Sequence, residues 1–149
     1  MVGKILMTVA TLSYGLLPLF MDISHTHVLN PDWTGHARLH NVWLLGITAG
    51  LGLWSLWLIW AVKDNPLASI RQACLNGVIV LGAFLLAVFT SPLYGGSIVV
   101  PVDGQVPTEG VYGNVIAFSI SLVLMIIGLS LIHIPSPRDQ RGSRMPSSA

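Results

Sequence analysis

Charged side chains are scarce in this chain: Lys, Arg, Asp and Glu together make up 9% of its 149 residues. A soluble domain of ordinary composition carries about 25% charged residues. Here 53% of the residues are hydrophobic and the mean hydropathy is +0.74. This composition excludes an ordinary soluble domain and predicts a membrane protein. The formal net charge is +1, which gives no electrostatic basis for a nucleic-acid partner.

Cysteine is almost absent, since Cys74 is the single one. One cysteine cannot form a disulfide within the chain, which excludes the small folds that depend on cross-links. Cys74 lies in an apolar run, where a cysteine ordinarily serves as a small buried hydrophobic residue.

Long apolar segments are what the chain has in abundance. Four of them approach the roughly 20 residues that an α-helix needs to cross the hydrocarbon core of a bilayer: 5–21, 42–62, 73–89 and 115–132. No small-x-small cleavage pattern follows the first segment, so we predict a helix there and not a signal peptide. The predicted fold is all-α, an integral membrane four-helix bundle.

Basic residues are distributed unevenly around these segments. Lys4 precedes the first segment, and Lys63 and Arg71 lie between the second and the third. Three arginines follow the fourth segment, whereas Arg38 is alone on the other side of the membrane. Because basic residues concentrate in cytoplasmic segments, we expect both termini to be cytoplasmic.

The chain divides into two parts by composition. Residues 1–134 contain all four apolar segments, so we predict one transmembrane domain there. Residues 135–149 lack apolar periodicity, which predicts a disordered cytoplasmic tail. The long outer loop, from 91 to 113, has Asp103-Gly104 between β-prone runs, which is compatible with a short β-hairpin.

Ionisable side chains gather in one outward-facing stretch of sixteen residues. It holds four of the five histidines: His25, His27, His36 and His40. Asn30-Pro31-Asp32 has the pattern of a helix start, with Asn30 as the N-cap, Pro31 in the first helical position and Asp32 favouring the helix dipole.

A helix from this start through the second apolar segment would be about 48 Å long. The hydrocarbon core is roughly 30 Å thick, so the first turns must project above the lipid or the helix must break, for example at Gly35. On one helix Asp32, His36 and His40 share a face because they are spaced by four residues. We expect both histidines to face the bundle interior, with Asp32 above them and Arg38 pointing elsewhere.

The leading functional hypothesis is acid/base chemistry on a lipophilic small molecule, an isomerisation or a cyclisation that needs no cofactor. Histidine exchanges protons at neutral pH, and a neighbouring carboxylate would orient it. The predicted catalytic residues are His36, His40, His27, Asp32 and Glu109. The predicted substrate-binding residues are Arg38, Trp33, Trp43 and Asn41.

Two alternatives stay open. The histidine spacings HxH and HxxxH suit a copper, zinc or iron ion held by His25, His27, His36 and His40, as in a metal-dependent oxidoreductase or a metal-handling protein. HxxxH without the glutamate of HExxH is not a specific signal. The other alternative is a non-catalytic assembly or transport partner, in which these side chains are solvated or bonded to the loop backbone.

Other features have structural explanations. Trp43, Trp54, Trp57 and Trp60 are typical of interfacial aromatic residues. Gly46, Gly50 and Gly52 allow close approach of helices, either within the chain or in a homo-oligomer. Asn76 is expected to form hydrogen bonds between helices.

The stretch "THVLNPDWTGHARLHNVW" resembles the signature of a family of small four-pass membrane proteins of unknown function. The matching positions are Thr26, His27, Asn30, Pro31, Trp33, His36, Ala37, Arg38 and His40. This resemblance implies the four-pass fold and no activity. A looser likeness, of architecture alone, is to sterol isomerases of the emopamil-binding type. That likeness implies histidine and acidic residues that move protons around a carbocation.

Overall fold

The computed structural model describes residues 1–99 and 113–133, and these form helices joined by short loops. Four helical spans are long and apolar enough to cross a membrane, which confirms the prediction of an all-α bundle of four membrane-length helices. The helices are α1 (Val2–Gly15), α2 (Leu17–Asp22), α3 (Gly35–Trp60), α4 (Pro66–Thr90) and α5 (Gly113–His133), with a 3-10 turn, η1 (Ser91–Leu93), after α4.

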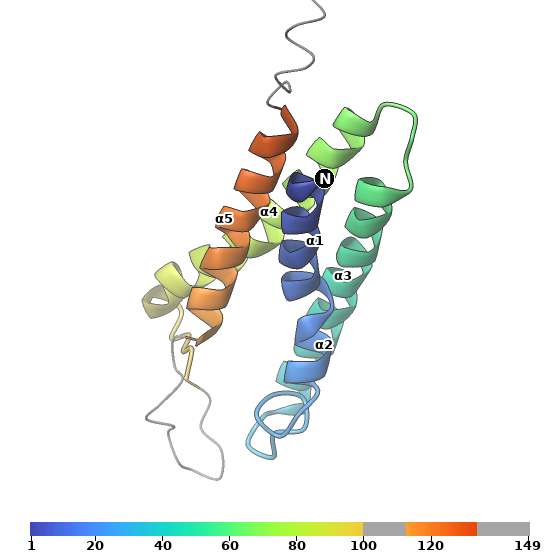
Figure 1. The fold of residues 1–149 in the computed structure, drawn as a ribbon. Helices are drawn as coiled ribbons and strands as arrows, with labels where there is room; N and C mark the ends of the chain where they lie inside the picture. Colours follow the sequence, from blue (N-terminus) through green and yellow to red (C-terminus); the bar gives the residue numbers. More distant parts are fainter. Residues whose placement is uncertain (100–112, 134–149) are drawn as a thin grey trace, which may run out of the picture.

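The links between the helices lie at two opposite ends of the molecule (Figure 1). The N-terminus, the link between α3 and α4 and the last turn of α5 lie together at one end. The loop of residues 23–34 lies at the other, which we call the histidine end. The described start of the α4–α5 connection, residues 91–99, lies at the histidine end as well. The predicted hairpin at Asp103-Gly104 and the predicted tail, 135–149, fall outside the described residues.

The first predicted helix is two helices. Leu16 separates α1 from α2, and Pro18 lies in the first turn of α2. Proline has no backbone N–H and cannot continue the hydrogen-bond ladder of a helix, which explains the interruption just before it. Together α1 and α2 still form one span of 21 residues.

The third helix starts later than its predicted cap. Thr34 is the N-cap of α3, and its side chain accepts a hydrogen bond from the N–H of Ala37 at 3.2 Å. The prediction that Asn30 caps this helix is wrong. The Asn30 side chain instead accepts from the N–H of Asp32 at 2.9 Å, a local turn that asparagine commonly forms. Asp32 therefore lies before the helix and not on it.

Asn65 and Pro66 determine where α4 begins, at the end of the α3–α4 link. The Asn65 side chain accepts from the N–H of Ala68, and Pro66 takes the first helical position. This helix begins seven residues before the apolar segment predicted from 73, because capping and not hydropathy determines where it starts.

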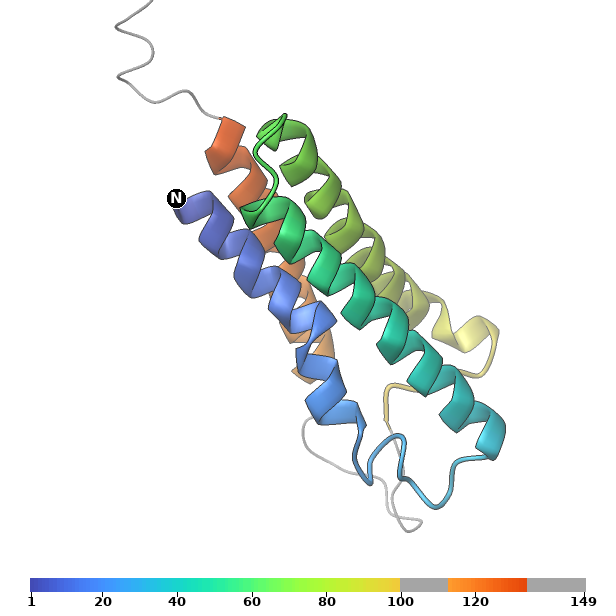
Figure 2. The same cartoon turned by 90° about the vertical axis from the view of Figure 1, so that its right-hand side faces the viewer.

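Glycine pairs allow α1 to pack tightly against two neighbours. A Cβ on Gly52 would lie 2.9 Å from the Cα of Gly15, where α3 crosses α1. Gly3 and Gly128 meet in the same way between α1 and α5. Figures 1 and 2 show α1 beside α3 in both views, with α5 on its other side. Helix α1 thus packs closely against both α3 and α5.

A polar network crosses the bundle interior. The hydroxyl of Tyr14 donates to the Oγ of Ser55 at 3.0 Å, and the Nδ2 of Asn76 donates to the same Oγ at 3.2 Å. Gln72 then donates to the Oδ1 of Asn76 at 3.0 Å. These hydrogen bonds join α1, α3 and α4. They fulfil the expectation for Asn76, whereas Tyr14 and Ser55 were not among the residues that the sequence singled out.

Candidate functional site

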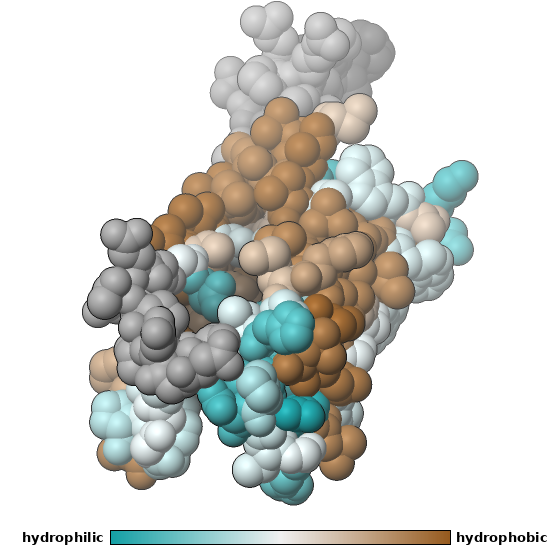
Figure 3. Space-filling model, turned by 90° about the horizontal axis from the view of Figure 1, so that it is seen from below, coloured by the Kyte–Doolittle hydropathy of each residue, from teal (hydrophilic) through white to brown (hydrophobic). Residues whose placement is uncertain are grey.

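The loop of residues 23–34 is closed by its own backbone hydrogen bonds. The N–H of Val28 donates to the carbonyl of Asp22 at 3.0 Å, and the N–H of Leu29 donates to the carbonyl of Ser24 at 2.9 Å. The N–H of Asn30 donates to the carbonyl of His27 at 3.0 Å. Seen from the histidine end, hydrophilic side chains gather at this end of the bundle and apolar side chains cover its flanks (Figure 3).

His27 lies beside an acidic side chain at the end of α2. Its Nδ1 is 4.0 Å from the Oδ1 of Asp22 and 2.9 Å from the Oγ1 of Thr26. About a quarter of each side chain of the ion pair is exposed, 23% for His27 and 25% for Asp22. The Trp33 ring lies edge-on to the imidazole, with centroids 5.6 Å apart. The structure thus joins a predicted catalytic histidine and a predicted substrate-binding tryptophan to a carboxylate.

Arg38 points toward the bundle. Its Nη2 donates to the carbonyl of Asn30 at 2.7 Å, and Asn30 itself is fully buried. Arg38 and Asn41 are both partly buried, and they extend the inward-facing stripe of α3 that continues through Leu45 and Thr48. Within the described residues, the Nε of Arg38 and the Oδ1 of Asn41 are buried without a hydrogen-bond partner. The arginine therefore anchors the loop and also leaves one donor unused.

His36 and His40 lie on the outer side of α3. Both are exposed, so the prediction that they face the bundle interior is wrong. Successive residues of a helix are turned by about 100°, and the inward positions of these turns belong to Arg38 and Asn41. The two imidazoles contact each other, with Nε2 atoms 3.1 Å apart and ring centroids 4.4 Å apart. The Trp43 ring lies 5.8 Å from that of His40.

The remaining predicted site residues do not join these groups. His25 and Asp32 are exposed on the loop, and Glu109 falls outside the described residues. Among residues 1–99 and 113–133, no three His, Cys, Asp or Glu side chains come together in a way that could hold a metal ion. Three of the described histidines form two separate groups, one around His27 and the other made by His36 and His40.

In a comparison with protein families, residues 6–142 match the model of a family of unknown function, DUF6640. The chain belongs to this family. The match covers the first membrane-length span from residue 6, the other three spans and the histidine loop, and it agrees with the expected membership of a family without an assigned function. Comparisons with curated proteins and with solved structures gave no match.

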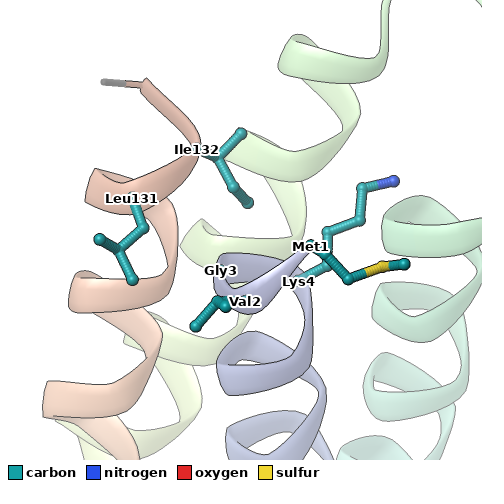
Figure 4. Close-up of a pocket in the computed structure, with 6 residues that line it drawn as sticks. All are labelled: Met1, Val2, Gly3, Lys4, Leu131 and Ile132. Atoms are coloured by element: carbon teal, nitrogen blue, oxygen red, sulfur yellow. The ribbon is translucent and has the colours of Figure 1, made fainter. Parts of the chain in front are cut away.

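A shallow hollow of about 510 Å³ lies on this DUF6640 member at the end opposite the histidines (Figure 4). It is formed by the first turn of α1 and the last turn of α5, and it is lined by Met1, Val2, Gly3, Lys4, Leu131 and Ile132. The ammonium of Lys4 donates to the carbonyl of Ile59 at 2.7 Å and lies 5.4 Å from the Trp60 ring centre. The other side chains of the lining are apolar.

Asp22 is the functional candidate that sequence reasoning undervalued in this DUF6640 member. The expected partners of the histidines were Asp32 and Glu109, although Asp22 is the first charge after the apolar segment 5–21. Asp22 ends a membrane helix five residues before His27. Its carboxylate can reach the imidazole of His27 if the chain turns back after the helix. The backbone bond from Val28 to the carbonyl of Asp22 makes that turn.

Proposed function

We propose that this protein is an integral membrane enzyme that isomerises or cyclises a lipophilic small molecule by proton transfer. The observation that carries the proposal is the contact of His27 with Asp22, both partly buried, where a membrane span ends. An imidazole and a carboxylate at the membrane boundary can move protons on a substrate that partitions into the bilayer.

His27 is the proposed general acid and base. Asp22 faces its Nδ1, so the carboxylate would orient the ring and stabilise its protonated form. The separation of 4.0 Å is longer than a hydrogen bond, and catalytic contacts of this kind commonly tighten when substrate binds. The proton would then be exchanged with the substrate at Nε2. Trp33, edge-on to the ring, would cover one side of the reacting group.

Arg38 and Asn41 are the proposed binding site for the polar group of the substrate. A buried polar atom without a partner costs about 1–3 kcal/mol. Here a donor, the Nε of Arg38, and an acceptor, the Oδ1 of Asn41, lie buried three residues apart on α3. A hydroxyl group can accept from the first and donate to the second, whereas a carboxylate has no proton to donate. The proposed substrate class is therefore a lipophilic alcohol.

The reaction class can be tested without knowing the substrate. Purified protein in lipid nanodiscs would be incubated in D₂O with a panel of isoprenoid alcohols and sterols. Rearrangement by proton transfer yields isomeric products that carry solvent deuterium bound to carbon. Mass spectrometry detects this deuterium after the hydroxyl deuterium has been exchanged back in H₂O. General acid–base catalysis contributes about 10²–10⁴-fold. We therefore expect His27→Ala and Asp22→Asn to lower the rate by that order.

His25→Ala is the matched control, because His25 is an exposed histidine of the same loop. We expect this variant to keep the wild-type rate. Deuterium incorporation that is equal in the His27→Ala and wild-type proteins would remove His27 from the mechanism. If no member of the panel takes up carbon-bound deuterium, the enzyme proposal fails, and a non-catalytic assembly or transport role becomes the better explanation.

We also propose that both termini lie in the cytoplasm and that the histidine end faces outward. Lys4, Lys63 and Arg71 belong to the end that carries the N-terminus, whereas Arg38 is the basic residue of the histidine end among those described. This asymmetry is the one on which the positive-inside rule depends.

A further inference from the structure

We infer that His36 and His40 form a chelating pair for one divalent ion of the late first transition row, such as Zn²⁺, Ni²⁺ or Cu²⁺. This pair is separate from the His27–Asp22 pair, so the inference does not depend on the proposed enzyme activity. Imidazole nitrogens are good ligands for these ions.

The geometry of the two rings fits a shared ion. Their Nε2 atoms are 3.1 Å apart, and the ring planes are inclined by 77°. Metal–nitrogen bonds are about 2.0–2.1 Å long for zinc. Two such bonds to atoms at the observed separation would enclose an angle of roughly 100°, which lies between the angles of square and tetrahedral coordination. Small rotations of the side chains would direct both lone pairs to one point.

Helix α3 holds the two ligands in this relation. Residues four apart are neighbours on one face of a helix, and the N-cap Thr34 fixes the turn that carries His36. The same spacing supplies two of the zinc ligands in the helical motif H-E-x-x-H. Here Ala37 stands where that motif has its glutamate, so the pair lacks the general base of a metalloprotease. What it retains is the capacity to bind an ion.

The coordination sphere of this pair is open. Among the described residues no third histidine, cysteine or carboxylate completes it, and both imidazoles are exposed. Structural zinc sites are closed by four protein ligands, whereas sites with open positions take water or another exchangeable ligand. The bound ion would therefore be exchangeable, which suits metal capture at the membrane surface better than structural support.

The test uses the full chain in detergent, purified through a tag that contains no histidine. Zn²⁺ and Ni²⁺ would be titrated separately by calorimetry. We expect one ion per chain, with His36→Ala and His40→Ala each weakening binding at least tenfold, and His25→Ala leaving it unchanged. Electron paramagnetic resonance of the Cu²⁺ complex should show coupling to two imidazole nitrogens in the wild-type protein.

A spacing control keeps the number of histidines constant. The double variant His40→Ala/Val42→His places the second imidazole six residues from His36, on a different face of α3, and Val42 is exposed. We expect this variant to lose binding as His40→Ala does. Binding that survives in the double variant would overturn the inference. So would an equal loss in His25→Ala, or an affinity that neither His36→Ala nor His40→Ala changes while the circular dichroism stays that of the wild type.

Discussion

Single residues show how closely the helices of this bundle approach one another. Gly52 faces Gly15 across the α1–α3 contact, whereas Gly46 and Gly50 face open space, with nothing that an added Cβ would meet within 4 Å. The sequence predicted close packing for all three glycines and could not choose among them. The choice depends on which face of α3 meets α1, and that register is set by contacts between residues far apart in the chain.

A methyl group at position 52 should therefore be costly. In Gly52→Ala the new Cβ would lie 2.9 Å from the Cα of Gly15, so the two helix backbones must separate. Overpacking of this kind costs about 1–3 kcal/mol. We expect Gly52→Ala to unfold at a lower SDS fraction than the wild type, as followed by circular dichroism.

Gly50→Ala is the matched control on the same helix. Its Cβ meets no atom, and alanine is favoured over glycine inside a helix by about 0.5–1 kcal/mol. This variant should be as stable as the wild type or slightly more stable. Equal destabilisation of the two variants would contradict the close crossing at Gly52.

The sequence indicated which types of residue form the candidate site better than it indicated where their side chains lie. Composition and clustering predicted a site at the histidine end of the molecule. Periodicity placed His36 and His40 inside, on the assumption that the helix began at Asn30 and faced inward there. Helical periodicity gives the relative angles of side chains but not the direction of the core. The inward stripe of α3 instead includes Arg38 and Asn41, and the carboxylate that meets His27 comes from the preceding helix.

At the scale of elements, hydropathy predicted each membrane-length helix of the described residues but missed where several of them begin or break. The helix starts depend on Thr34 and Asn65 as N-caps. Ser55 illustrates what joins the elements: its Oγ accepts from Tyr14 of α1 and from Asn76 of α4. The hydroxyl of Ser55 on α3 therefore connects three helices. The sequence around Ser55 does not predict this role.

Ser55→Ala should weaken the bundle. Hydrogen bonds between membrane helices contribute on average about 0.6 kcal/mol each, up to about 1.7, and this change removes two of them. We expect a loss of about 1–3 kcal/mol in the free energy of unfolding, measured by SDS titration in mixed micelles.

Ser130→Ala is the comparison for that measurement. The exposed Ser130 hydroxyl donates to the carbonyl of Ile126 in its own helix, so removing it breaks no described contact between helices. Its effect should stay within about 0.5 kcal/mol. If the two serine variants have the same stability, the network does not hold the helices together.

At the scale of the whole molecule, the protein is a four-span bundle with polar groups at the histidine end and basic residues near the other. The sequence predicted this arrangement because span length and basic-residue placement are nearly local properties. Its orientation can be tested with cysteine labelling, since the single native cysteine, Cys74, is buried.

His25→Cys and Asp64→Cys each add one exposed cysteine, at opposite ends of the molecule. In intact cells, a membrane-impermeant maleimide should label His25→Cys and should label Asp64→Cys only after the membrane is opened. The unchanged protein serves as the blank. The reverse labelling pattern would place the termini outside and the histidines in the cytoplasm.

The close packing of α1 against α5 has a consequence for how the protein is made. Among the described helices, the most extensive contact of α1 is with α5, and Gly3 meets Gly128, 125 residues later in the chain. At a synthesis rate of about 5–20 residues per second, the first helix waits roughly 6–25 s for its main neighbour. During that interval its face for α5 is covered by lipid or by the insertion machinery, and a chain that stops before α5 never buries it.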